Sequence, residues 1–274
     1  MKSEEVSMST LAFQGSAMAL SSDGMAIVSE ALHVRNPEIW AVLSVETSGC
    51  GYLPDRRSQI LFERHIFHRL TKGNFDDGDV SEPTPGGYGP RGAPQYDRLN
   101  RAILKDRAAA LQSASWGLGQ IMGMNFAKAG FQNVEDMVAA MSDSEDRQLM
   151  AMANFLTGTG LASFLRGHDW ASFARGYNGP NFAINRYDVR LNSEFQRFSS
   201  GVLPDLMVRA AQLYLTYLGF HPGPIDGIAG EHTMGALADF EMQTGVQHDN
   251  TIDEACVARL QSALATRSAS GIAA

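Results

Sequence analysis

The sequence predicts a mainly α-helical protein in two parts, a large helical domain with a small β-hairpin region and a smaller helical domain behind it. Apolar residues recur at helical spacing through most of the first 198 residues. A short aromatic and β-branched run at 59–67 interrupts this helical pattern. A Ser-Ser-Gly break at 199–201 then separates the acidic remainder of the chain.

Composition and net charge limit the classes of protein to which the chain could belong. The 274 residues are 44% apolar and 19% charged, which is ordinary for a globular protein. The formal net charge of -8 argues against nucleic acid as a partner, because phosphate binding needs a basic face. It also argues against simple electrostatic adhesion to anionic membranes or walls.

The chain carries no obvious address for export. Its first residues include two Glu and no apolar core of signal-peptide length, and no stretch approaches a membrane span. Cys50 and Cys256 are too few for a disulfide scaffold and are predicted to be free thiols. We therefore expect a product of the bacterial cytoplasm, without signal peptide or membrane insertion, that needs another route to work outside.

The elements follow in order along the chain. Residues 1–20 are weakly patterned and predict a loose arm. A helix starts at Ser22 or Asp23, and Asn36-Pro37 marks the start of a second helix. That second helix, 37–47, is apolar on nearly every side, and Gly49 and Gly51 end it.

Two glutamates stand in apolar surroundings. Glu46 shares a helical face with Ile39, Val42 and Leu43, at the last turn of the buried helix. Glu63 lies inside the run 59–67, which predicts a short strand or irregular hairpin.

The remainder of the first part is loop and helix. Residues 74–94 are rich in Gly, Pro and Asp and predict a long surface loop of the kind that is often functional. From 95 to about 198 the pattern is helix after helix. Ser142 and Glu145 form a predicted capping box, and Gly158 ends the helix that follows.

The tail, residues 202–274, contains a dense motif. It consists of Leu218-Gly219-Phe220, a glycine-rich turn and a second helix, with these matching positions: Leu218, Gly219, Gly223, Asp226, Gly227, Gly230, Thr233, Ala236, Leu237 and Phe240. This resembles the three-helix peptidoglycan-binding domain of wall hydrolases, although Glu241 replaces the usual Gln. The resemblance implies cell-wall binding through Asp226, Gly227 and Phe240. Alternatively, Asp226 only bonds the amides of its own turn.

Residues 1–201 contain four motifs in order: Glu46-Thr-Ser-Gly49, the segment Ile60–His65, Ser115–Met122 with Gln120, and Tyr177-Asn178-Gly179-Pro180. The first, third and fourth resemble motifs of goose-type lysozymes and soluble lytic transglycosylases. The full set resembles the N-acetylmuramidase domain of phage endolysins over residues 22–198. The resemblance implies a lysozyme-like domain in which Glu46 is catalytic and Gln120, Tyr177 and Asn178 bind substrate, although Asn178 could equally be a turn residue.

The residue types suit glycosidic cleavage. Such cleavage needs an acid that stays protonated near neutral pH, and apolar surroundings raise the pKa of a Glu side chain. Glu46 is the predicted general acid. Glu63 is the candidate second catalytic carboxylate, or else it pairs with Arg64, Arg56 or Arg57, and Asp55 and Asp97 are weaker rivals.

Cofactor chemistry finds no support in the sequence. His65 and His68 are three residues apart, but no zinc motif surrounds them, and Gly86–Gly89 lacks the Lys-Ser/Thr of a phosphate-binding loop. We expect neither a metal nor a cofactor.

These observations predict an endolysin that hydrolyses the bond from N-acetylmuramic acid to N-acetylglucosamine in peptidoglycan. Its setting would be host lysis in the periplasm, as a monomer helped by a holin-type export route. The alternatives are a lytic transglycosylase that uses the same Glu, a non-catalytic wall-binding or virion structural protein and, more remotely, a metallopeptidase. Because every candidate catalytic residue lies before residue 202, we also expect residues 1–201 to cleave peptidoglycan alone.

Overall fold

The computed structural model describes residues 13–47, 49–75, 77–245 and 251–269. In chain order its elements are α2 (Ser22–Leu32), α3 (Asn36–Thr47), β1 (Ile60–Phe62), α4 (Arg64–Leu70), α5 (Pro94–Ile103), α6 (Arg107–Gln112), β2 (Ala114–Trp116), β3 (Ile121–Met122), the 3-10 helix η1 (Gly123–Asn125), α7 (Val134–Asp143), α8 (Glu145–Gly158), α9 (Leu161–Arg166), α10 (Trp170–Asn178), the 3-10 helix η2 (Phe182–Asn185), α11 (Tyr187–Ser200), α12 (Leu206–Tyr217), α13 (Glu231–Thr244) and α14 (Glu254–Ala269). The predicted class, mainly helical with a small sheet and a helical C-terminal domain, is confirmed.

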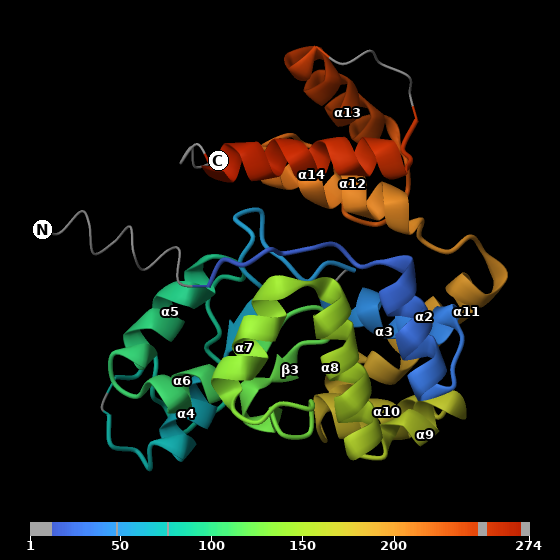
Figure 1. The fold of residues 1–274 in the computed structure, drawn as a ribbon. Helices are drawn as coiled ribbons and strands as arrows, with labels where there is room; N and C mark the ends of the chain where they lie inside the picture. The colour runs from blue at the N-terminus through green and yellow to red at the C-terminus, as the bar shows by residue number, and fades with distance from the viewer. Residues whose placement is uncertain (1–12, 48, 76, 246–250, 270–274) are drawn as a thin grey trace, which may run out of the picture.

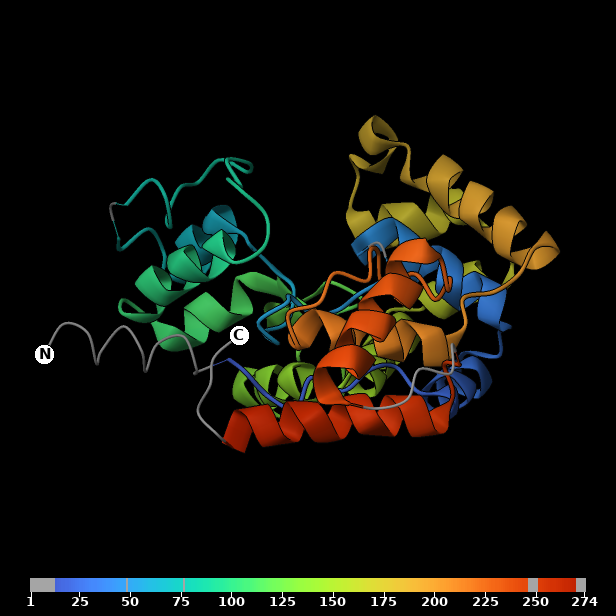
Figure 2. The same ribbon diagram turned by 90° about the horizontal axis from the view of Figure 1, so that it is seen from above.

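The large domain has two groups of helices. Helices α4, α5 and α6 lie on one side, and α2, α3 and α9–α11 lie on the other (Figures 1 and 2). The small domain, α12–α14, stacks over one face of this assembly (Figure 1). Among the described residues, no helix combines the length and the apolar character that crossing a membrane requires.

Helix α3 is the buried helix that the sequence predicts. Ile39, Val42 and Leu43 are fully buried, and Trp40 packs near Phe198 of α11 with ring centroids 6.3 Å apart. Helix α11 provides the most extensive partner surface for α3. This packing fixes the axis of α3 and therefore the position of Glu46 in its last turn.

The sheet joins segments far apart in sequence. Strands β1, β2 and β3 pair antiparallel in that order, with Ile60 opposite Trp116 and Phe62 opposite Ala114. The prediction of continuous helices from 95 to 198 is therefore wrong at β2 and β3. Gly117, whose φ of +68° suits glycine, makes the turn between them, and its missing side chain leaves room for Gln148.

The strand prediction for 59–67 is only half correct. Pairing ends at Phe62, and the backbone N–H of Glu63 donates to the carbonyl of Ser113. The carbonyl of Glu63 then accepts from Ile66 and Phe67, which opens helix α4. Glu63 therefore lies between β1 and α4, and its side chain belongs to neither face of the sheet.

Two other local predictions need correction. Ser144, not Ser142, caps α8, since its side chain accepts the N–H of Arg147 at 3.2 Å, whereas Ser142 belongs to the last turn of α7. The predicted loose arm is packed where it is described, because Phe13 and Leu20 are buried in the core. Residues 1–12 of that arm lie outside the described residues.

Candidate active site

The carboxyl of Glu46 can be reached by solvent, although protein atoms crowd around it. Its side chain is partly exposed at the end of α3, and protein surrounds it on most sides. Desolvation raises the pKa of its carboxyl from 4.5 to about 7, even though a hydrogen bond from Asn178 and the charge of Arg190 lower it. A carboxyl with this pKa still holds its proton in a large share of molecules at neutral pH.

Asn178 is the direct partner of Glu46. Its Nδ2 donates to Oε1 of Glu46 at 3.0 Å, across 132 residues of sequence. Its Oδ1 is buried and has no hydrogen-bond partner within the described part of the chain. Asn178 ends α10, so the packing of that helix aims the amide at the carboxyl.

The glycine-rich segment after β2 lies against the end of α3. The hydroxyl of Thr47 donates to the carbonyl of Leu118 at 3.1 Å, and that of Tyr177 donates to Gly119 at 2.5 Å. The charge of Glu46 is one cause, after burial, of the raised pKa of Tyr177. Three of the four sequence motifs therefore meet around one carboxyl.

Gln120 lies in the turn between β2 and β3. Its Nε2 donates to the carbonyls of Gly117 at 2.9 Å and Gln59 at 3.2 Å, and its Oε1 accepts from Ser115 at 2.8 Å. Both amide hydrogens are therefore engaged with the backbone. In this conformation the side chain braces the turn, and a bond to a sugar N-acetyl group would require it to exchange a partner.

Glu63 is the second carboxyl with a raised pKa. Burial raises it from 4.5 to about 7, against a hydrogen bond from Tyr88 that lowers it. Nδ1 of His65 lies 3.1 Å from its Oε2 without hydrogen-bonding geometry. Of the arginines expected as partners, Arg57 pairs with Asp55, and Arg64 donates to carbonyls of the 74–94 loop.

The charges of the two carboxyls act on two tyrosines. Tyr88 hydrogen-bonds Glu63, and the pKa of Tyr187 responds to the charges of Glu46 and Arg190. Burial is the main cause of the raised pKa of both phenols. The sequence does not single out Tyr88, Tyr187 or Arg190, because a lone Tyr in a loop and the first turn of a helix carry no motif that marks them.

The two rival carboxylates, Asp55 and Asp97, lie in other surroundings. Asp55 makes two bonds, of 2.6 and 2.8 Å, to the guanidinium of Arg57. Asp97 is exposed on the first turn of α5. Neither shares the environment of Glu46 and Glu63.

No group of three or more His, Cys, Asp or Glu side chains is arranged to hold a metal ion, as far as the described residues extend. His68 instead faces the hydroxyl of Ser81 at 3.2 Å. Burial, Arg69 and Arg64 lower the pKa of His65.

The predicted wall-binding residues hold the small domain together. Asp226 Oδ1 accepts from the N–H of Ile228 at 2.9 Å, as the turn-stapling alternative predicts. Gly227 has a φ of +75°, and a side chain there would collide with Asp205. Phe240 is 3% exposed and packs edge-on to Phe220. These positions support the module, so a wall polymer would meet the surface built over them.

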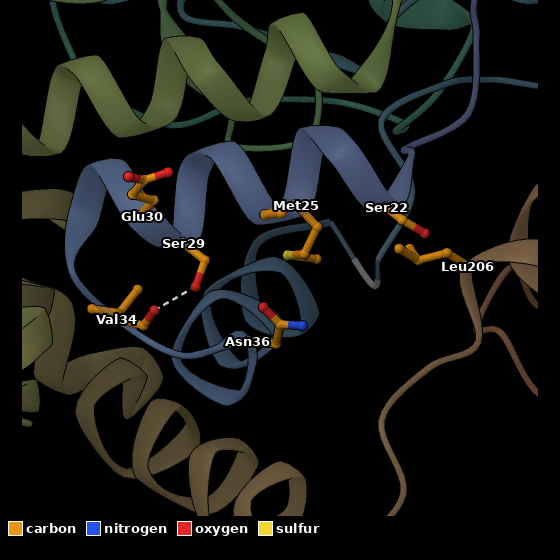
Figure 3. A pocket seen from close by; sticks show the side chains of 8 residues that line it. Ser22, Met25, Ser29, Glu30, Val34, Asn36 and Leu206 are labelled. Carbon is orange, nitrogen blue, oxygen red and sulfur yellow. Dashed lines mark hydrogen bonds between the residues drawn. The ribbon is translucent and has the colours of Figure 1, made fainter.

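Among the hollows that the described residues border, two lie next to α3. One, of about 510 Å³, is bordered by α2, the start of α3 and Leu206 (Figure 3). Its Asn36 is ten residues before Glu46, about 15 Å along a helix. The other, of about 710 Å³, lies between α3, α11 and the turn at 225–229. Neither is lined by Glu46 or Glu63.

Comparison with known proteins agrees with this arrangement. Residues 35–199 match the N-acetylmuramidase family, and residues 205–260 match a peptidoglycan binding domain. The crystal structure of the Burkholderia AP3 phage endolysin is 37% identical, covers 66% of this chain and 71% of its own, and superposes with a TM-score of 0.61. No curated protein matches the chain. The chain belongs to the N-acetylmuramidase family, and it is a glycoside hydrolase of peptidoglycan with a C-terminal peptidoglycan-binding domain.

Proposed function

We propose that Glu46 is the general acid that protonates the glycosidic oxygen between N-acetylmuramic acid and N-acetylglucosamine. The observation that carries this role is the partly accessible carboxyl with a pKa of about 7, held by Asn178. Protonating a leaving oxygen requires an acid whose pKa lies near the working pH. Arg190 and Asn178 then stabilise the carboxylate that remains after proton transfer.

Glu63 is the proposed second carboxylate. It lies between β1 and α4, where its carboxyl is half-buried and accepts a hydrogen bond from Tyr88. As a base it would activate the water that attacks the sugar, or as a charge it would stabilise the oxocarbenium-like transition state. Tyr177 and Gln120 would line the sugar site on the side of the turn between β2 and β3.

The rival chemistry is that of a lytic transglycosylase. Such an enzyme uses one glutamate and no second carboxylate, and leaves an anhydro-muramic end. Glu63, with its raised pKa and no arginine in its described contacts, favours hydrolysis.

Mass spectrometry of the digest separates the two chemistries. Purified peptidoglycan cut by the full chain should yield reducing N-acetylmuramic acid ends, which are heavier than anhydro ends by the mass of the one water that hydrolysis adds. Anhydro products would identify a transglycosylase. Binding to sacculi with no fragment released would support the non-catalytic alternative.

The setting is part of the same proposal. We infer that the protein is a phage endolysin made in the host cytoplasm and released to the wall by a holin-type route, where it acts in the periplasm as a monomer. The likeness to an endolysin supports the setting, and the acidic charge of -8 gives no support to self-driven adhesion from outside. The proposed domain limits are 1–201 for catalysis and 202–274 for wall binding, supported by the gap between the two family matches.

A further inference from the structure

A buried ion pair joins the small domain to the large one. Arg209 of α12 and Glu145 of α8 are both fully buried. Nη1 and Nη2 of Arg209 donate to the two carboxylate oxygens at 2.5 and 2.7 Å. Such a pair costs desolvation free energy, so it is weak evidence for net stability, and removing one partner would leave the other charge buried and unpaired.

The same guanidinium reaches the turn behind Glu46. Nε of Arg209 donates to the carbonyl of Gly49 at 2.9 Å, and Nη2 donates to the same oxygen. On the far side of the pair, Glu145 accepts the N–H of Gly51 at 2.9 Å. The turn from Gly49 to Gly51 is therefore held at both ends by the Arg209–Glu145 pair.

The turn has few anchors of its own. Gly49 has a φ of +85°, and neither Gly49 nor Gly51 has a side chain, so Cys50 is the one residue of the turn whose side chain reaches a core. The turn begins two residues after the helix that carries Glu46. A catalytic group must be held within about 0.5 Å of its productive position, and the residues behind it must be fixed to achieve this.

The small domain makes further contacts around the pair. The hydroxyl of Tyr217 donates to the carbonyl of Ala17, and that of Tyr214 accepts the N–H of Ala19, both at 3.1 Å. Cys50, inside the turn that the pair holds, belongs to the apolar core of the small domain. The two domains thus share one core at this junction, which is unlike a module tethered by a linker.

We propose that Arg209 is a positioning residue for the muramidase reaction: through the Gly49 carbonyl and Glu145 it fixes the turn that follows α3 and so steadies the end of that helix, where Glu46 lies. The C-terminal domain is then a structural part of the active site. The proposal rests on Glu46 being the general acid. It replaces the expectation that residues 1–201 cleave alone, because truncation would take Arg209 away from Glu145 and the Gly49 carbonyl and would open to water the apolar core that Cys50 shares with the small domain.

The test uses the full chain and two kinds of substrate. Arg209→Lys keeps the charge but lacks the fork that reaches Gly49 and Glu145 together. The double variant Arg209→Met, Glu145→Gln removes the buried charges as a pair. The matched control is Arg107→Met, which breaks a bidentate but exposed pair with Glu135. Folding is checked by thermal melting, turnover on a soluble peptidoglycan oligomer, and attachment by sedimentation with sacculi.

We expect the folded Arg209 variants to lose at least about tenfold in kcat on the soluble oligomer, since small misplacements of catalytic groups are costly. KM and sacculus binding should stay unchanged. The alkaline limb of the pH profile should move to lower pH as water reaches Glu46, whereas Arg107→Met should match the wild type.

Other outcomes overturn the proposal. A kcat within twofold of the wild type, or a loss confined to sacculus binding, would make the C-terminal domain an attachment device only. Failure of both variants to fold would assign the pair a purely structural role. A wild-type chain that cleaves neither substrate would instead refute the proposed function itself, and with it the basis of this inference.

Discussion

Glu46 is tuned by opposing influences that differ in size. Burial raises its pKa, and the amide of Asn178 and the charge of Arg190 lower it by less. Removing the amide in Asn178→Ala should therefore raise the pKa of Glu46 further, and the alkaline limb of kcat/KM should move above its wild-type position. Turnover should also fall, because the carboxylate formed in the reaction loses its donor. An alkaline limb that stays fixed or moves downward would contradict this account of the site.

The two carboxyls together predict a narrow pH optimum. Glu46 must be protonated and Glu63 ionised, and both pKa values are raised to about 7. The profile of kcat/KM should be bell-shaped and centred near pH 7, with values that belong to the coupled pair.

Glu63→Gln should remove the acid limb, keep the alkaline limb and reduce turnover by about 10²-fold or more. A thermal melt on the same sample separates this from a structural role. Lowered thermal stability with turnover and both limbs intact would show that Glu63 only supports the fold through Tyr88.

Residues with a motif around them can be predicted from sequence, and residues without one cannot. Glu46 and Asn178 stand out because their neighbours form recognisable patterns, and the structure brings them to 3.0 Å. The sequence predicts that Glu145 completes a helix cap, yet it forms a buried ion pair with a residue 64 positions away. No local pattern indicates a partner at that distance, because tertiary packing alone selects it.

At the scale of elements, hydrogen bonds hold the part of the long loop that spans residues 77–94 against α4 and α5. Arg64 of α4 donates to the carbonyl of Gly86 at 2.8 Å and to that of Gly78 at 2.7 Å. Gln95 donates to Tyr88 and Pro90. These bonds place the phenol of Tyr88 at Glu63.

Arg64→Ala should release this loop and reduce turnover by about tenfold, with a smaller effect on folding, because the hydrogen bonds that Arg64 makes lie near the surface. Arg69→Ala, an exposed change on the same helix, is the matched control. Measuring turnover and melting temperature on the same samples separates an effect on catalysis from an effect on folding. Equal turnover in the two variants would leave the loop as an inert connection.

Element boundaries show where sequence patterns stop being informative. The apolar helix α3 agrees with its prediction to within one residue, because glycines bound it and Pro37 opens it. The strand prediction for 59–67 fails after Phe62, since Ile66 and Phe67 are buried on a helical face just as they would be on a strand. A three-residue strand such as β2 has too little sequence to show a period.

For the whole molecule, the tuned carboxyls predict how stability depends on pH. The folded chain keeps protons on Glu46 and Glu63 that the unfolded chain releases between pH 4.5 and about 7. The native state therefore binds more protons in that window, and stability falls as pH rises through it.

Glu46→Gln removes one of these groups, so its stability relative to wild type should be greater at pH 8 than at pH 5, by about 1–3 kcal/mol. Urea unfolding at the two pH values measures the difference. An identical difference at both would mean that the carboxyl of Glu46 is solvated as in the unfolded chain.

The two-domain organisation is readable from the sequence, but the junction is not. A Ser-Ser-Gly break and a change in motif mark the limit near 201. Whether the two domains pack together or move independently depends on which side chains of α12 face the large domain. Arg209 is fully buried there, although arginine side chains are usually exposed.

The central claim is that Glu46 supplies the proton, and Glu46→Gln on purified peptidoglycan tests it most directly. Gln keeps the shape and can still contact Asn178, but it cannot deliver a proton. With Glu30→Gln as an exposed helical control, and with folding confirmed by thermal melting, we expect turnover to fall by about 10²–10⁴-fold in Glu46→Gln alone. Near-wild-type turnover of a folded Glu46→Gln would contradict the account.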